Sequence, residues 1–236
     1  MNDHFENPAV ATQLLELFKP HFETEDVNDA VYNALVEAIT CRVFPGGTRL
    51  SSSNLANVFG VSRTPVQIAL VRLEHDGLIR SDQTRRYSTY DASFQQGRDI
   101  NEYMLGMYMF ACKLAHARGL DAYYNNLLKL RLERLREETD VYTYVREDNN
   151  FHRVIVQSTN NLELLRAFDA ITLKSNIMVM KVRKDNTPED YIQTHHDLNE
   201  RLLCAIKGSD AALLDQIIVE HNDYCMINVC NWIADP

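Results

Sequence analysis

Two side chains that can bind a divalent cation stand four residues apart in the second half of the chain, within the stretch DNNFH. They are Asp148 and His152. If this stretch is helical, both side chains lie on one face, a turn apart. A carboxylate and an imidazole placed in this way can hold a metal when other helices supply further ligands. Spacing alone does not separate such a site from a structural hydrogen-bonded pair, which is the commoner arrangement.

A second stretch, 51–79, has the spacing of a DNA-binding helix-turn-helix. The predicted first helix spans 54–59, and Gly60 forms the turn after it, because glycine adopts backbone angles that other residues resist. The second helix has a possible Ser or Thr cap, a proline in its first turn and a glycine at its end. These residues are Ser62 or Thr64, Pro65 and Gly77. Two short helices around such a turn predict a motif whose second helix enters the major groove.

This region resembles the DNA-binding domain of the GntR family of regulators. Four blocks follow one another in the family's order and spacing: FPGGTRL at 44–50, NLA at 54–56, GVSRTPV at 60–66 and RLEHDGLI at 72–79. Linked blocks are more specific than a single helix-turn-helix pattern. The resemblance implies a winged domain that starts with a helix at 29–41 and ends with a two-stranded wing carrying Arg85 and Arg86.

The candidate DNA-contacting residues are Arg49, Ser53, Ser62, Arg63, Thr64, Gln67, Arg72, Arg85 and Arg86. The chain departs from the family at Ser53 and Gln67, where arginine is usual, at Ile68, where Glu is usual, and at the wing tip, which lacks the family's glycine. Glutamine pairs with adenine, whereas arginine pairs with guanine. We therefore expect an operator different from the family's commonest one, or a weakly binding domain.

The remainder of the chain has helical patterns throughout. The expected helices span 99–118, 121–138, 140–158, 161–183, 188–207 and 209–233. A helical region of this size after a GntR-type domain resembles the FCD effector-binding domain of the FadR subfamily. The D-x-x-F-H phrase at 148–152 and the closing phrase from Ala205 to His221 carry this resemblance.

The FCD resemblance implies a metal site that combines Asp148 and His152 with one residue from each of the last two helices. The family supplies histidines there, and the matching positions in this chain are Asn199 and His221. Asparagine is a weaker neutral oxygen ligand, so we expect zinc or nickel to bind weakly or partially. His195 and His196 lie about one helical turn before Asn199.

The same resemblance places an effector cavity in the helical region. FCD domains usually offer an Arg and, four residues later, a Glu, where this chain has Met104 and Tyr108. Either the hydrophobic core is larger here, or the effector is less acidic and more apolar. The candidate effector-binding residues are Tyr103, Met104, Tyr108 and His196.

Composition and charge set the broad class. The 236 residues are 45% hydrophobic and 24% charged, which is typical of a globular protein of one or two domains. The net charge of -9 argues against general coating of nucleic acid, although residues 27–92 carry seven Lys or Arg against six Asp or Glu. No apolar run is long enough for a membrane helix, and the N-terminus has no signal-peptide pattern. The five scattered cysteines indicate reduced, mostly buried thiols in a cytoplasm.

We therefore predict a mainly α protein: an N-terminal winged helix-turn-helix with a small β wing, followed by an all-α, FCD-like bundle. The predicted parts are a helical extension at 1–26, the DNA-binding domain at 27–92, a linker at 93–98 and an effector-binding and dimerisation domain at 99–236. The expected function is a cytoplasmic, homodimeric transcriptional regulator that binds a double-stranded DNA operator under effector control, with no membrane partner and no enzymatic activity. The alternatives are a metal-dependent enzyme and an interaction module with a decayed DNA-binding domain.

Overall fold

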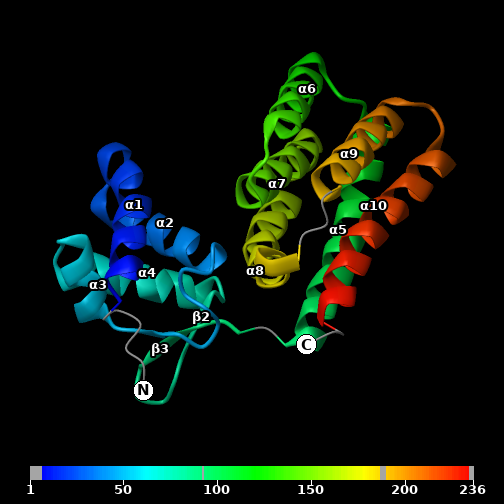
Figure 1. Cartoon of the computed structure of the whole chain (residues 1–236). Coiled ribbons are helices and arrows are strands. Elements are labelled where there is room, and N and C mark those ends of the chain that lie inside the picture. The colour runs from blue at the N-terminus through cyan, green and yellow to red at the C-terminus, as the bar shows by residue number, and fades with distance from the viewer. Residues whose placement is uncertain (1–6, 92, 187–189, 234–236) are drawn as a thin grey trace. The chain divides into compact units, whose positions relative to one another are not determined.

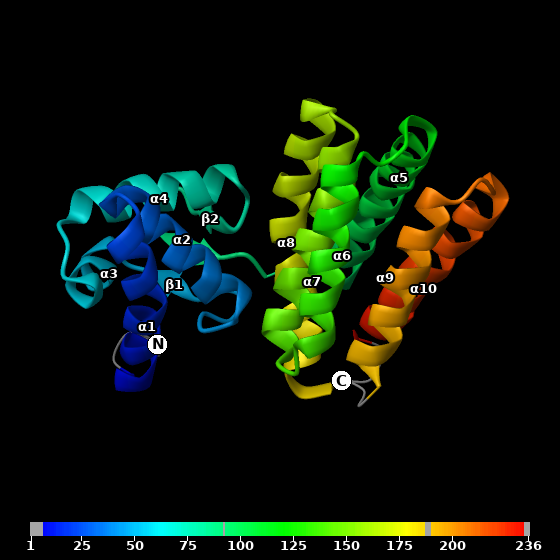
Figure 2. The same cartoon turned by 90° about the horizontal axis from the view of Figure 1, so that it is seen from above.

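The computed structural model describes the backbone of residues 7–91, 93–186 and 190–233, and their side chains except those at 94, 141–142, 180–186 and 225–233. The chain divides into two compact units, Met1–Ser93 and Phe94–Pro236 (Figures 1 and 2). The predicted fold class is confirmed, because the first unit is a winged helix-turn-helix with a small sheet and the second is built from helices. No helix among the described residues is long and apolar enough to cross a membrane.

The first unit packs four helices against a small antiparallel sheet. The helices are α1 (Pro8–Thr24), α2 (Val27–Thr40), α3 (Ser52–Phe59) and α4 (Arg63–His75), and the strands are β1 (Arg49–Leu50), β2 (Ile79–Ser81) and β3 (Tyr87–Thr89). The strand order is β1-β3-β2, so the described sheet has a third strand that the sequence did not predict. β1 joins it because Arg49 and Leu50 pair with Ser88 and Tyr87.

Turn chemistry defines the helix-turn-helix. Ser51 accepts a hydrogen bond from the Asn54 N–H, so α3 begins at Ser52, two residues before the predicted start. Gly60 ends this helix with φ 67°, in the left-handed region that glycine adopts without strain. Ser62 is the N-cap of α4, but its side chain makes no capping hydrogen bond. The Ser62 hydroxyl is therefore not committed to the helix.

The predicted N-terminal extension is helical and packs on the first unit. Its residues Val10, Leu14 and Phe18 are buried, and the Phe18 ring centroid lies 4.7 Å from that of Phe59. Helix α1 contains Pro20 and continues past it to Thr24. Proline has no backbone N–H, so Pro20 cannot donate a hydrogen bond to the Glu16 carbonyl. Glu16 is exposed, so water can satisfy that carbonyl instead.

The second unit consists of helices. These are α5 (Phe94–Arg118), α6 (Ala122–Glu137), α7 (Val141–Ser158), α8 (Leu162–Asn186), α9 (Tyr191–Lys207) and α10 (Ala211–Ile233). The six predicted spans match them closely, except that α5 begins at Phe94, so residues 94–98 of the predicted linker are helical. Residues 188 and 189 of the predicted fifth span, and the last three residues of the predicted domain, lie outside the described residues.

Two hydrophobic clusters hold these helices together. The larger one includes Leu128, Phe151, Leu202 and Ile217 from α6, α7, α9 and α10, and the smaller one joins α5, α7 and α8 around Phe168. Helices α9 and α10 pack along each other and both contact α5 (Figures 1 and 2). Side chains from α5, α7, α9 and α10 therefore meet inside the unit.

The cysteines differ partly from the prediction of buried thiols. Of the three described ones, Cys112 is buried, Cys41 is half-buried and Cys204 is exposed, and none forms a disulfide. Burial raises the pKa of the Cys112 thiol to about 12, although a hydrogen bond with Tyr108 opposes this shift. The side chains of Cys225 and Cys230 lie outside the described residues.

Candidate functional site

The recognition helix α4 presents a solvent-exposed face opposite its buried one. Val66, Leu70 and Leu73 point into the core, which leaves one exposed face for the remaining side chains. That face carries Arg63, Thr64, Gln67, Ile68 and Val71. Three of the predicted DNA-contacting residues on this helix are thus available to a duplex.

A groove of about 610 Å³ runs between α4, the start of α3 and the wing. Among the side chains that line it are Arg49, Gln67, Val71, Arg85 and Arg86. Four of these five were predicted from the sequence to contact DNA. Arginines on the strand side and an amide on the helix side give this groove the chemistry of a phosphate- and base-contacting surface.

Arg72 lies elsewhere. Its guanidinium pairs with Asp29 of α2 at 2.5 Å and lies over the Tyr32 ring, 4.0 Å from its centroid. The structure therefore places this predicted DNA-contacting residue in an intramolecular contact with α2, because it projects from the edge of α4 that borders α2. Ser53 is half-exposed, and its hydroxyl is hydrogen-bonded to Ser51 at 2.9 Å.

Asp82 shapes the wing tip. Its carboxylate accepts hydrogen bonds from the Thr84 hydroxyl and the Thr84 and Arg86 N–H groups. The Thr84 side chain, then the Arg86 backbone, lower the pKa of Asp82. Arg85 has φ 56°, a left-handed conformation that glycine usually supplies. The wing without glycine thus keeps a glycine-like turn and displays two arginines.

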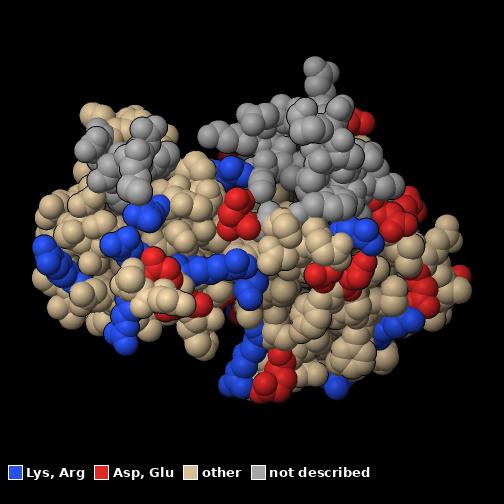
Figure 3. Space-filling view, turned by 90° about the horizontal axis from the view of Figure 1, so that it is seen from below, with Lys and Arg blue, Asp and Glu red and all other residues tan. Residues whose placement is uncertain are grey.

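The face of the first unit shown in Figure 3 is not uniformly basic. Blue Lys and Arg side chains are scattered among neutral and red acidic ones. This pattern agrees with the near balance of seven Lys or Arg and six Asp or Glu in residues 27–92. Because phosphate neutralisation supplies much of the affinity for DNA, one such unit alone should bind weakly.

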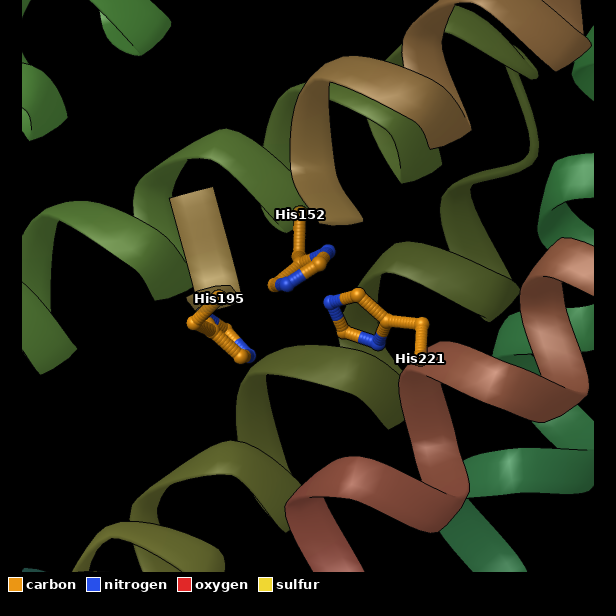
Figure 4. A group of neighbouring side chains, drawn as sticks. All are labelled: His152, His195 and His221. Carbon is orange, nitrogen blue, oxygen red and sulfur yellow. The ribbon is translucent and has the colours of Figure 1, made fainter. Parts of the chain in front are cut away.

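The second unit buries a cluster of three histidines. His152 of α7, His195 of α9 and His221 of α10 each offer a ring nitrogen, and these atoms lie within 4.8 Å of one another. Figure 4 shows the three imidazoles turned toward a common space. All three residues are buried, with relative exposures of 8%, 1% and 6%.

Asp148 and Asn199 complete the cluster. The Asp148 carboxylate lies 3.4 Å from His152 Nε2 and 3.3 Å from His195 Nδ1. The Asn199 amide donates to Asp148 Oδ1 at 2.6 Å, while its oxygen lies 3.0 Å from His221 Nε2. The predicted set Asp148, His152, Asn199 and His221 therefore converges.

Two tyrosines orient the histidines. The Tyr108 hydroxyl lies 2.5 Å from His152 Nδ1, and the Tyr144 hydroxyl lies 3.2 Å from His195 Nδ1. Hydrogen bonds of this kind fix the orientation of an imidazole ring, so that its other nitrogen points at a bound metal.

His195 was not predicted as a ligand. It stands four residues before Asn199, so the two share one face of α9. That helical spacing was the signal that could have identified it. In this chain His195, one turn before Asn199, supplies the ring nitrogen that α9 offers to the cluster.

Burial and charge set the protonation of the cluster. Burial alone would raise the pKa of Asp148, but electrostatic attraction to His195 and His152 and hydrogen bonds with them outweigh it and hold that pKa well below its usual range. Burial lowers the pKa of His221 well below its ordinary value, and His195 and His152 lower it further, although Asp148 opposes them. An ionised carboxylate and a neutral imidazole are the forms that bind metals.

The histidine cluster forms one wall of a cavity of about 120 Å³. Met104 and Tyr108 line it, as predicted, together with residues such as Asn101, Asn149 and Asn176. This space is larger than one water molecule requires. It has apolar walls with a few polar groups, which is the usual character of a small-molecule site.

Two predicted effector-binding residues lie away from this cavity. Tyr103 is 55% exposed, because it projects from the outer face of α5. His196 is buried but points in another direction from His195, and its Nε2 lies 3.3 Å from Glu200 of the same helix. Adjacent residues on a helix differ by about 100° in direction, so His195 and His196 cannot both reach the cavity.

Two known families match this chain. Residues 28–87 match the bacterial regulatory proteins of the gntR family. Residues 100–224 match the FCD domain. The first match contains the helix-turn-helix and most of the wing, and the second contains the histidine cluster and the cavity.

Curated relatives extend over most of the chain. The uncharacterized HTH-type transcriptional regulator YdhC of Bacillus subtilis (strain 168) is 23% identical over 199 residues, 82% of this chain and 87% of that protein. The HTH-type transcriptional repressor RspR of Escherichia coli (strain K12) is 24% identical over 206 residues, with coverages of 84% and 86%.

Solved structures share the fold. E. coli McbR/YncC has a TM-score of 0.76 at 20% identity and covers 87% of this chain and 98% of its own. A putative transcriptional regulator GntR from Rhodococcus sp. RHA1 has a TM-score of 0.62 at 16% identity, with coverages of 89% and 98%. These likenesses concern the arrangement of the elements.

Proposed function

Since this chain belongs to the GntR family of bacterial regulatory proteins and carries an FCD domain, it is a DNA-binding transcriptional regulator with an effector-binding C-terminal domain, and we propose the residues through which it works. The α4 face and the wing bind the operator. The cavity beside the histidine cluster binds a small effector. The observation that carries the proposed effector site is the burial of an ionised Asp148 and three histidines against that cavity.

The DNA-binding surface divides into two kinds of contact. Arg49, Arg85 and Arg86 lie along the groove at positions suited to phosphates, which fix the register of the protein on the duplex. Arg63 and Gln67 project from α4 toward the bases, where arginine favours guanine and glutamine favours adenine. Ser62, with an uncommitted hydroxyl at the helix N-terminus, can donate to a phosphate.

A divalent cation fits the histidine cluster. His152, His195 and His221 would supply nitrogens and Asp148 a carboxylate oxygen, a donor set that suits zinc or nickel. Asn199 would hold Asp148 and His221 in place through its two hydrogen bonds. When bound, the metal supplies a positive charge that attracts lone pairs of the effector.

Helix α5 gives a physical route for control. It begins at the boundary between the two units and supplies Asn101, Met104, Leu105 and Tyr108 to the cavity. A ligand that contacts α5 differently in two conformations shifts the balance between them. Because allosteric coupling is reciprocal, operator binding should in turn change effector affinity.

We also propose that the protein acts as a cytoplasmic homodimer and that the metal serves ligand binding and not catalysis. The curated relatives are HTH-type transcriptional regulators, which supports this role. A dimer would present two recognition helices to two half-sites, and this compensates for the weak charge of one DNA-binding unit.

Selection of genomic fragments by the purified full-length protein tests the proposal. We expect enrichment of a pseudo-palindromic site whose affinity falls steeply with salt. The control is a variant with Arg63, Arg85 and Arg86 changed to Ala, which should enrich nothing. Absence of any enriched sequence with the parent protein at low salt would overturn the proposal.

A further inference from the structure

Two apolar side chains stand exposed on the DNA-facing side of the recognition helix. Ile68 is 42% exposed and Val71 is 57% exposed, although both are β-branched aliphatic residues that are usually buried. The buried face of α4 is filled by other residues, so neither Ile68 nor Val71 is needed for the core.

Their position on the helix makes them part of the base-facing surface. Ile68 follows Gln67, and Val71 comes one turn later, so they flank the centre of the exposed face. Val71 lines the same groove as Gln67 and the arginines of the wing. A duplex whose phosphates meet those arginines would have its major groove against these two side chains.

The major groove offers one apolar group to such side chains, the C5-methyl of thymine. We infer that Ile68 and Val71 contact thymine methyl groups and so determine part of the operator sequence, an inference that rests on the proposed DNA binding by α4. Together with adenine recognition by Gln67, this makes the core of each half-site rich in A·T pairs.

The methyl contact can be separated from the hydrogen bonds to the same base. Deoxyuridine has the same hydrogen-bonding groups as thymidine and lacks only the methyl group. Replacing contacted thymines by deoxyuridine therefore removes the apolar contact alone. The loss should be about fourfold in affinity per contacted methyl, the value for withdrawing one methyl-sized group from an apolar contact.

The test uses the full-length protein and the operator found by fragment selection. Each thymine of the half-sites is replaced in turn by deoxyuridine, and dissociation constants are measured by fluorescence anisotropy. We expect sensitive positions within each half-site. Val71→Ala and Ile68→Ala should each remove this sensitivity at the one thymine that the truncated side chain contacts. Duplexes with thymine or deoxyuridine at that position should then have equal dissociation constants.

The matched control is His75→Ala. His75 lies on the same exposed side near the C-terminal end of α4, and its side chain is 88% exposed. This variant should keep the parent's sensitivity to deoxyuridine. Because all three side chains are exposed, the variants should melt within a few degrees of the parent, which shows that they are folded.

Three results would overturn the inference while leaving DNA binding intact. They are an operator without thymine in its half-sites, less than twofold change after full deoxyuridine replacement, and unchanged sensitivity in the variant lacking both Ile68 and Val71 side chains. Failure to bind any DNA would instead overturn the proposed function itself, and this inference with it.

Discussion

His195 and Asn199 share one face of α9 and divide two tasks at the histidine cluster. His195 offers a nitrogen within 4.8 Å of those of His152 and His221, whereas Asn199 hydrogen-bonds Asp148 and His221. The proposed ligand and the proposed supporting residue are thus distinguishable by mutation, because losing a ligand would remove a bond to the metal and losing a support would only loosen the site.

We expect His195→Ala to weaken zinc binding by more than about tenfold, because the cluster would retain two histidines. His196→Ala is the matched control, since it removes a buried histidine of the same helix that points elsewhere. Competition with a fluorescent chelator measures both affinities. Equal zinc affinities of the two variants would show that His195 is not a ligand.

The protonation of His221 predicts how acid affects the metal-free protein. Its pKa is lowered in the folded state, first by burial and then by His195 and His152. In the unfolded chain this histidine titrates near its ordinary value of about 6.5, so below that pH the unfolded state binds more protons. Neutral His221 therefore contributes fully to the free energy of unfolding above about pH 6.5, and this contribution is lost as the pH falls.

With a chelator present, we expect the free energy of unfolding to fall with a slope of up to about 1.4 kcal/mol per pH unit below pH 6.5 from this one group. Urea unfolding at pH 7.5 and 5.5 measures the loss. The His221→Gln variant should lose less stability over the same interval. An identical loss in parent and variant would mean that His221 does not titrate in this way.

Arg63 and Arg72 are both arginines of α4 but have different surroundings. Arg63 is exposed at the helix start, whereas Arg72 pairs with Asp29 and lies over Tyr32. We expect Arg63→Ala to weaken operator binding by about 1–3 kcal/mol and Arg72→Ala to have a much smaller effect. Electrophoretic mobility shifts measure both, and a larger loss in Arg72→Ala would contradict the assignment.

At the scale of elements, the wing combines a strained turn with a charge that we propose contacts DNA. Arg85 holds φ 56°, which costs a non-glycine residue of the order of 1 kcal/mol. Arg85→Gly should therefore leave stability unchanged or raise it by about 0.5–1 kcal/mol, while operator affinity and the salt dependence of binding both decrease.

Thermal melting and operator titrations at two salt concentrations separate these effects. Arg80→Gly in β2 is a control for adding a glycine to the sheet, and it should destabilise the wing because Arg80 packs over the Tyr90 ring, 4.8 Å from its centroid. If Arg85→Gly binds the operator as tightly as the parent, Arg85 does not contact a phosphate.

For the whole molecule, the weak charge of the DNA-binding unit argues for paired half-sites. We expect light scattering at micromolar concentration to give twice the chain mass of 27.2 kDa, and the operator to be pseudo-palindromic. Duplexes with a single half-site should bind far more weakly than the complete operator. A monomeric mass together with full affinity for a single half-site would contradict a dimeric regulator.

The sequence by itself determined the elements and the kind of protein. Cap, turn and proline chemistry around 51–79 indicated the helix-turn-helix, and apolar periodicity gave the six later helices to within a few residues. Both signals are local, because caps and helical faces depend on residues within a few turns. The pairing of Asp148 with His152 followed from the same helical period.

Only the tertiary structure decided which side chains meet across helices. The packing of α9 and α10 against each other and against α5 brought His195 into the cluster and left His196 outside it, and the contact with α2 engaged Arg72. The extension α1 packs on its own unit through contacts such as that between Phe18 and Phe59. Periodicity fixes the direction of a side chain on its own helix, but the neighbour that it meets depends on how the helices pack.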